Sequence, residues 1–190
     1  MSYPTTPEFS AINVESVINN ISSEARNGRI QVRGTGGQKW KFTARYNDLT
    51  RAEFSPVYAF VNAQNGRLNT FDVTPPVIGS TQGDATGTMS ANGAHSIGDS
   101  TINVDGFTGT IKAGDFVKFA SHNKVYMVTA DVTGAGSLAI TPTLVEAVAD
   151  DEVITYNDVP FKMRLDNDVQ SFGLRGFDRY SFEVDFIEVI

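Results

Sequence analysis

Residues 39–46 have the sequence KWKFTARY, the clearest secondary-structure signal in the chain. Apolar side chains occupy the even-numbered positions, and hydrophilic side chains, three of them cationic, occupy the odd-numbered positions. Strict alternation of this kind is typical of a β-strand with one buried face and one exposed face. The pattern predicts a strand that turns an aromatic face toward a core and a cationic face outward.

The end of the chain repeats this pattern with the opposite charge. Residues 180–187 read YSFEVDFI, and their aromatic and aliphatic side chains alternate with Glu183, Asp185 and other residues. Opposite charges on neighbouring antiparallel strands attract one another by roughly a few tenths of a kcal/mol per pair. We therefore expect residues 1–76 and 156–190 to form one sheet domain of the β-sandwich type.

The residues before the first strand also have an extended pattern, from Gly28 to Arg33. The GTGG of residues 34–37 then predicts a hairpin turn between the two extended runs. A phosphate-binding loop would require a helix after the glycines, and a strand is predicted there instead.

One helix is predicted after the first strand. It begins at Thr50, where Glu53 is spaced to complete a capping box, and Asn65-Gly66 provides a left-handed end. Pro56 is tolerated if the helix starts a residue or two late. The residues at helical spacing on its apolar face are Phe54, Val57, Tyr58 and Val61.

The middle of the chain, residues 77–155, is predicted to be an inserted β-domain. It follows Pro75-Pro76 and opens with a segment rich in Gly, Ser and Thr, residues 79–100, which we interpret as a flexible link or exposed loop. Short apolar runs separated by turn signals then predict a small β-barrel or sandwich. The predicted fold class is therefore mainly β, with one helix, a terminal-sheet domain and an inserted barrel-like domain.

Composition supports a folded domain made in a cytoplasm. Of the 190 residues 41% are hydrophobic, with 17 glycines and 13 phenylalanines, which favours short strands and tight turns. No run approaches the roughly 20 apolar residues that cross a bilayer, and no cysteine is present to form a disulfide or a thiolate site. We expect no membrane insertion.

The charge distribution argues against specific nucleic-acid binding. Twenty-two acidic residues against fifteen basic residues give a formal charge of −7, and the basic residues are scattered. A protein that follows a phosphate backbone needs a basic stripe, which is not visible here.

The sequence contains no convincing catalytic, cofactor or metal site. Its two histidines, His95 and His122, are too few and too distant for a zinc site, and His122 is predicted to be a solvated turn residue. No Gly-x-Ser-x-Gly elbow is present, although a Ser-His-Asp triad is not thereby excluded. The carboxylates of residues 150–152, 166–168 and 183–185 are expected to be solvated, and 166–168 lacks the later residues of a calcium loop.

Several stretches resemble tail-tip proteins of bacteriophages related to the distal tail protein. They are GQKWKFT (37–43), LTRAEF (49–54), AF (59–60), NGR (65–67), Phe71, GDFVKF (114–119), KVYMV (124–128) and YSFEVDFIEV (180–189). The resemblance implies a virion component with a β-sandwich ring domain. Such rings usually contain six copies and join the tail tube to the tip or the baseplate hub.

Three functions compete on this evidence. The leading hypothesis is a non-enzymatic ring subunit of a tail tip or baseplate, made in the host cytoplasm, with the tail tube protein, the hub and other baseplate proteins as partners. The second is a receptor- or carbohydrate-binding module that would need exposed aromatic residues in the inserted domain, with Phe107, Phe116, Phe119 and Tyr126 as candidates. The third is a tail-associated hydrolase. For the ring, the candidate charges that bridge subunits are Arg33, Arg45, Arg51, Glu183, Asp185 and Glu188.

Overall fold

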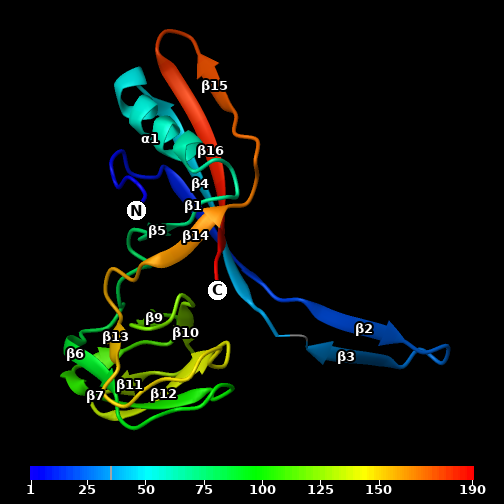
Figure 1. The fold of residues 1–190 in the computed structure, drawn as a ribbon, viewed down its shortest axis with the longest axis vertical. Helices are drawn as coiled ribbons and strands as arrows, with labels where there is room; N and C mark the ends of the chain where they lie inside the picture. Colours follow the sequence, from blue (N-terminus) through cyan, green and yellow to red (C-terminus); the bar gives the residue numbers. More distant parts are fainter. Residues whose placement is uncertain (35) are drawn as a thin grey trace. The chain divides into compact units, whose positions relative to one another are not determined.

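A computed structural model describes residues 1–34 and 36–190 and confirms a mainly β fold with one helix (Figure 1). The chain divides into two compact units. The sheet unit comprises Pro4–Thr70 and Met163–Val189, and the barrel unit comprises Met1–Tyr3, Phe71–Lys162 and Ile190. Each unit is described by itself.

The sheet unit contains an antiparallel sheet built from both ends of the chain. Its strands β1 (Ala11–Val17), β4 (Lys39–Leu49), β16 (Arg179–Glu188) and β14 (Phe161–Leu165, of which the last three residues belong to this unit) follow one another in that order. Strand β15 (Phe172–Arg175) pairs with the start of β16. The strands at the two ends of the sequence are therefore hydrogen-bonded neighbours in the structure.

The pairing of β4 with β16 confirms the predicted match between the two alternating stretches. Phe42 lies opposite Phe186, and both side chains are fully buried, whereas Arg45 lies opposite Glu183 on the exposed face. Alternation on both strands puts the apolar residues on the same side. One strand register therefore buries the aromatic residues together and also places the opposite charges side by side.

Helix α1 (Arg51–Ala63) covers aromatic residues of this unit. The Glu53 carboxylate accepts hydrogen bonds from the backbone N–H and the hydroxyl of Thr50, at 2.9 and 2.8 Å, as the capping box predicts. These bonds hold the pKa of Glu53 below its usual value. The helix starts at Arg51 with Thr50 as its N-cap, as predicted, so Pro56 lies in its second turn and the condition under which its missing N–H would cost nothing is not met.

Aromatic residues of the helix and of both alternating strands pack in one core. Phe54 and Tyr58 on the helix lie 6.0 and 5.7 Å, between ring centroids, from Phe182 on β16. Trp40, like Phe42 and Phe186, is buried, whereas Tyr58 is only half-buried. Helix and sheet therefore share one core.

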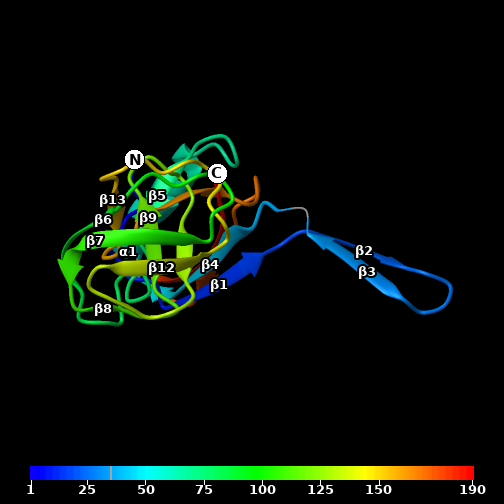
Figure 2. The ribbon, with the colours of Figure 1, turned by 90° about the horizontal axis from the view of Figure 1, so that it is seen from below.

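Strands β2 (Asn20–Glu24) and β3 (Ile30–Gly34) form a separate two-stranded ribbon (Figures 1 and 2). The sequence predicted a hairpin between the runs on either side of residues 34–37, a stretch that includes Thr35, which lies outside the described residues. That pairing is wrong, because β3 pairs with β2 and β4 pairs with β1 and β16. The pattern of β2 is too polar to have indicated a strand.

The barrel unit contains a closed barrel, as the repeated short apolar runs predicted. Hydrogen bonds connect its strands in the order β10, β12, β7, β6, β13, β9. The six strands are β6 (Thr86–Ala91), β7 (Thr101–Thr108), β9 (Phe116–Phe119), β10 (Tyr126–Val128), β12 (Gly136–Thr141) and β13 (Val153–Thr155). The unit also contains three short strands, β5 (Phe71–Val73), β8 (Thr110–Ile111) and β11 (Val132–Thr133), and the first two residues of β14.

The segment rich in small residues, 79–100, is not a flexible link. It contains β6, whose Met89 and Ala91 are fully buried in the barrel. A Cβ atom at Gly83 would overlap the backbone carbonyl of Thr110, so glycine is required where these two chain segments meet. The small residues permit close backbone contact, which composition cannot distinguish from flexibility.

We propose that residues 77–155 fold separately from the domain formed by the termini, and deletion tests this division. Joining residues 76 and 156 with a short Gly-Ser link should leave a remainder that unfolds cooperatively, because the β4–β16 pairing lies outside the deleted segment. Urea unfolding followed by the fluorescence of Trp40 checks it. A remainder without a cooperative transition would contradict the division.

Candidate assembly interface

The six candidate interface charges have different environments. Arg45 Nε lies 2.7 Å from Glu183 Oε2 across β4 and β16, with both side chains more than half exposed. The hydroxyl of Thr43 donates a 2.6 Å hydrogen bond to Asp185 Oδ1. These three charged residues therefore have partners within their own sheet.

The other three candidates, Glu188, Arg33 and Arg51, lie in three different environments. Glu188 is 1% exposed, and its carboxylate accepts a 3.0 Å hydrogen bond from the backbone N–H of Trp40. Arg33 lies on the exposed ribbon, and Arg51 is the first residue of α1, where its backbone N–H donates to Asp178. A role between subunits stays a prediction for all six residues.

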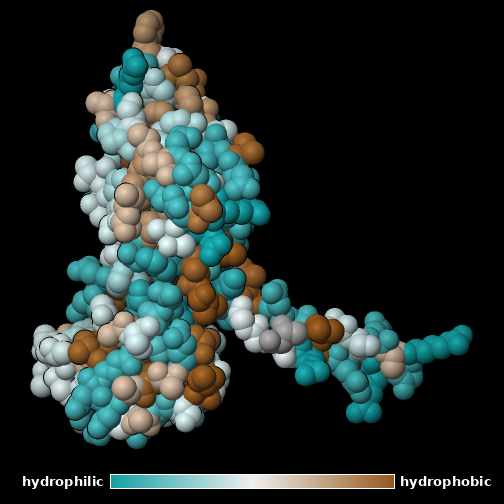
Figure 3. Space-filling view, in the orientation of Figure 1, coloured by the Kyte–Doolittle hydropathy of each residue, from teal (hydrophilic) through white to brown (hydrophobic). Residues whose placement is uncertain are grey.

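The ribbon presents apolar side chains to solvent. All ten residues of β2 and β3 are exposed, and Ile21, Ile30 and Val32 are 62%, 62% and 65% exposed. Figure 3 shows hydrophobic atoms among hydrophilic ones along this ribbon. An isolated two-stranded hairpin is at best marginally stable in water, so contact with another molecule would stabilise the ribbon.

A second exposed apolar surface lies on the hairpin of β15 and β16. Phe172 and Leu174 are 46% and 60% exposed, and Phe177 in the connecting turn is fully exposed. Strand β15 pairs with β16 alone among the described strands, so its outer edge has free backbone groups. Exposed strand edges of this kind are sites where other chains add.

His122 does not have the predicted solvated environment. It is 1% exposed, its Nδ1 lies 2.9 Å from the hydroxyl of Tyr126, and its ring lies against Phe119. A turn residue is buried here because the barrel closes over it. The hydrogen bond makes His122 part of the barrel core.

The acidic clusters serve as hydrogen-bond acceptors within each unit. Asp166 pairs with Lys41 at 2.8 Å, and Asp168 accepts a 2.9 Å hydrogen bond from the backbone N–H of Arg67. Burial alone would raise the pKa of Glu152, but hydrogen bonds from Ser121 and Ala149 hold that pKa below its usual value. The described residues contain no group of acidic or histidine side chains arranged for a metal ion.

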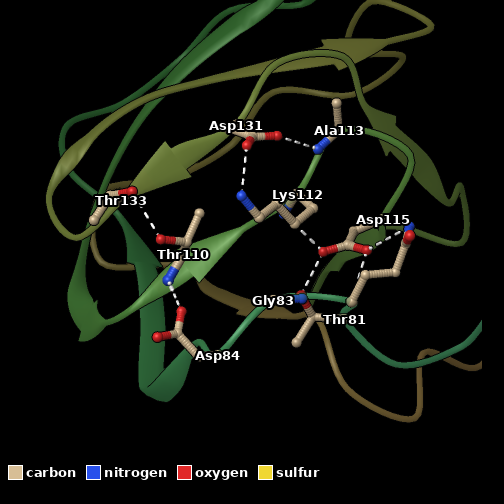
Figure 4. A network of polar contacts seen from close by, with 10 residues as sticks. Thr81, Gly83, Asp84, Thr110, Lys112, Ala113, Asp115, Asp131 and Thr133 are labelled. Carbon is tan, nitrogen blue, oxygen red and sulfur yellow. Dashed lines mark hydrogen bonds and ion pairs between the residues drawn. The ribbon is translucent and has the colours of Figure 1, made fainter.

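Asp115 organises a polar network that the sequence did not identify (Figure 4). It is 2% exposed and accepts hydrogen bonds from the backbone N–H groups of Gln82 and Lys112, both at 2.9 Å, and from the hydroxyl of Thr81. In the sequence Asp115 belongs to the turn signal Ala113-Gly114-Asp115, and a carboxylate in a turn is ordinarily solvated. The network joins the start of the barrel to the β8–β9 turn.

The barrel does not offer an aromatic binding platform. The four aromatic candidates for a receptor- or carbohydrate-binding module, Phe107, Phe116, Phe119 and Tyr126, are all buried. Sugar-stacking sites need exposed rings.

No helix among the described residues has the length and apolar character needed to cross a membrane.

Comparisons with known proteins confirm the resemblance to distal tail proteins. Residues 79–159 match the family described as "Distal tail protein pb9, B domain", which covers most of the barrel unit. The chain is also 28% identical to "Distal tail protein pb9" of Escherichia phage T5 over 184 residues, covering 89% of this chain and 87% of that protein. The similarity therefore extends over both units.

Proposed function

We propose that this chain, which is similar to a phage distal tail protein, is a structural subunit of the phage tail. In this proposal it acts without catalysis, as one of six copies in a ring of the virion. The ring joins the tail tube protein to the tip, the hub and other baseplate proteins. The observation that carries the proposal is the exposed β2–β3 ribbon, whose apolar side chains are not buried by any of the described residues.

In a ring, each subunit can bury the apolar side chains of its β2–β3 ribbon against a neighbouring subunit. Fully burying an aliphatic side chain of this size contributes about 1.5–3 kcal/mol, and Ile21, Ile30 and Val32 are each more than 60% exposed. A contact between the ribbon of one copy and a different surface of the next copy is heterologous, and such contacts close into a ring when the rotation permits. Closure would give every ribbon the same partner.

A reconstruction of the intact particle tests the ring. We expect six copies of this chain around the tail axis, between the tube and the tip, with each ribbon against a neighbouring copy. A single central copy, a peripheral receptor-binding position or absence from the virion would overturn the proposal.

Variants of the ribbon test which surface holds the ring together. The double substitution Ile30→Ser and Val32→Ser should sharply lower incorporation of the chain into purified tails, because it removes apolar area from the contact. Leu68→Ser is the matched control, since Leu68 is 75% exposed but lies outside the ribbon. Mass spectrometry of the tails measures both, and equal incorporation of the two variants would contradict the role of the ribbon.

A further inference from the structure

The β15–β16 hairpin places two arginines directly opposite one another. Arg175 and Arg179 are cross-strand partners, and both side chains are exposed. Like charges at directly opposite positions of an antiparallel pair are destabilising. The Arg179 guanidinium donates a hydrogen bond to the backbone carbonyl of Asp48, whereas the Arg175 side chain has no hydrogen bond or ion pair with another described residue. The free chain therefore contains an unfavourable charge pair that an anion would relieve.

A hollow of about 410 Å³ lies beside this pair on the exposed face of β4, β15 and β16. Small residues make space in it, because Gly173 lies opposite Ser181 and has no side chain. A Cβ atom at Gly173 would lie 2.8 Å from the Ser181 hydroxyl oxygen. Arg45, Arg175 and Glu183 also line the hollow. The Glu183 carboxylate forms an ion pair with Arg45.

We propose that this hollow docks an acidic segment of a partner protein, with Arg175 and Arg179 as the groups that contact its carboxylate. A guanidinium binds a carboxylate through two parallel hydrogen bonds. Arg175 lines the hollow, and Arg179 is its partner on the neighbouring strand. The proposal concerns a different surface from the β2–β3 ribbon and does not depend on ring formation.

The surrounding charges favour a peptide over a nucleic acid. Glu183 lines the hollow and Asp185 lies two residues further along the same face of β16. A continuous phosphate backbone would pass these carboxylates and be repelled by them, since nucleic-acid binding depends on neutralising many successive phosphates. A short segment with one or two carboxylates can reach the arginines alone.

Charge reversal at Arg175 distinguishes a docking role from a structural one. Arg175→Glu creates an opposite-charge pair with Arg179, so the free full-length protein should unfold at a higher temperature than the parent. The same variant should bind a synthetic serine-rich peptide with two glutamates at least about tenfold more weakly. A merely structural residue would lower thermal stability when it is changed.

Calorimetry at low ionic strength, with the glutamine version of the peptide as a blank, measures the binding. Arg29→Glu is the matched control, because Arg29 is an exposed arginine in the turn between β2 and β3 and its replacement makes the same change in net charge. We expect that control to bind the acidic peptide like the parent protein. Equal weakening in both variants, no binding by the parent, or tighter Arg175-dependent binding of a single-stranded oligonucleotide would overturn the proposal.

Discussion

Phe182→Ala is expected to lower the free energy of unfolding of the sheet unit by about 3–5 kcal/mol. The Phe182 ring is buried between helix and sheet, with its centroid 6.0 Å from that of Phe54 and 6.3 Å from that of Tyr46. Its neighbours belong to β4 and α1, which are fixed by their own hydrogen bonds and cannot easily collapse into the cavity. The chain has a single tryptophan, Trp40 on β4, so its fluorescence in urea follows this unit.

Phe177→Ala is the control, since it removes the same side chain from the same hairpin. Phe177 is fully exposed, and surface substitutions usually change stability by less than about 0.5 kcal/mol. Similar losses in the two variants would show that the assignment of Phe182 to the core is wrong.

Asp115→Ala is expected to destabilise the barrel unit by about 2–4 kcal/mol. The substitution leaves the backbone N–H groups of Gln82 and Lys112 and the hydroxyl of Thr81 without their acceptor. The three hydrogen bonds are partly buried, and an unsatisfied buried donor costs about 1–3 kcal/mol. Amide hydrogen exchange in β9 and β10 measures the loss within the barrel.

Asp131→Ala is the matched control in the same region. Asp131 also accepts a backbone N–H, from Ala113, and its pairing with Lys112 at 2.8 Å lowers its pKa. Both side chains of that pair are about half exposed, so water replaces the lost contacts and the effect on exchange should be small. An equal effect of the two substitutions would mean that burial of Asp115 does not decide its contribution.

The sequence predicted some strands of each unit and missed others. Alternation predicted β4 and β16 and their common sheet, because both strands have one buried face and their charges match in register. The same reasoning missed β1 and β2, in which few side chains are buried and the apolar pattern is correspondingly weak. In the barrel unit it recognised the short apolar runs after residue 100 but interpreted β6 as a link.

The amino-acid sequence by itself determined the mainly β class, the capped helix and the pairing of the two ends of the chain. The class and the helix follow from side-chain periodicity and local hydrogen bonding. The pairing follows from the matching alternation and the opposite charges of residues 39–46 and 180–187. Only the tertiary structure decided that Gly83 meets the Thr110 carbonyl, that His122 and Asp115 are buried, and that Arg175 opposes Arg179. These features arise when segments distant in sequence come into contact. The type of a residue does not by itself show whether the residue is buried or which residue lies opposite it on the next strand.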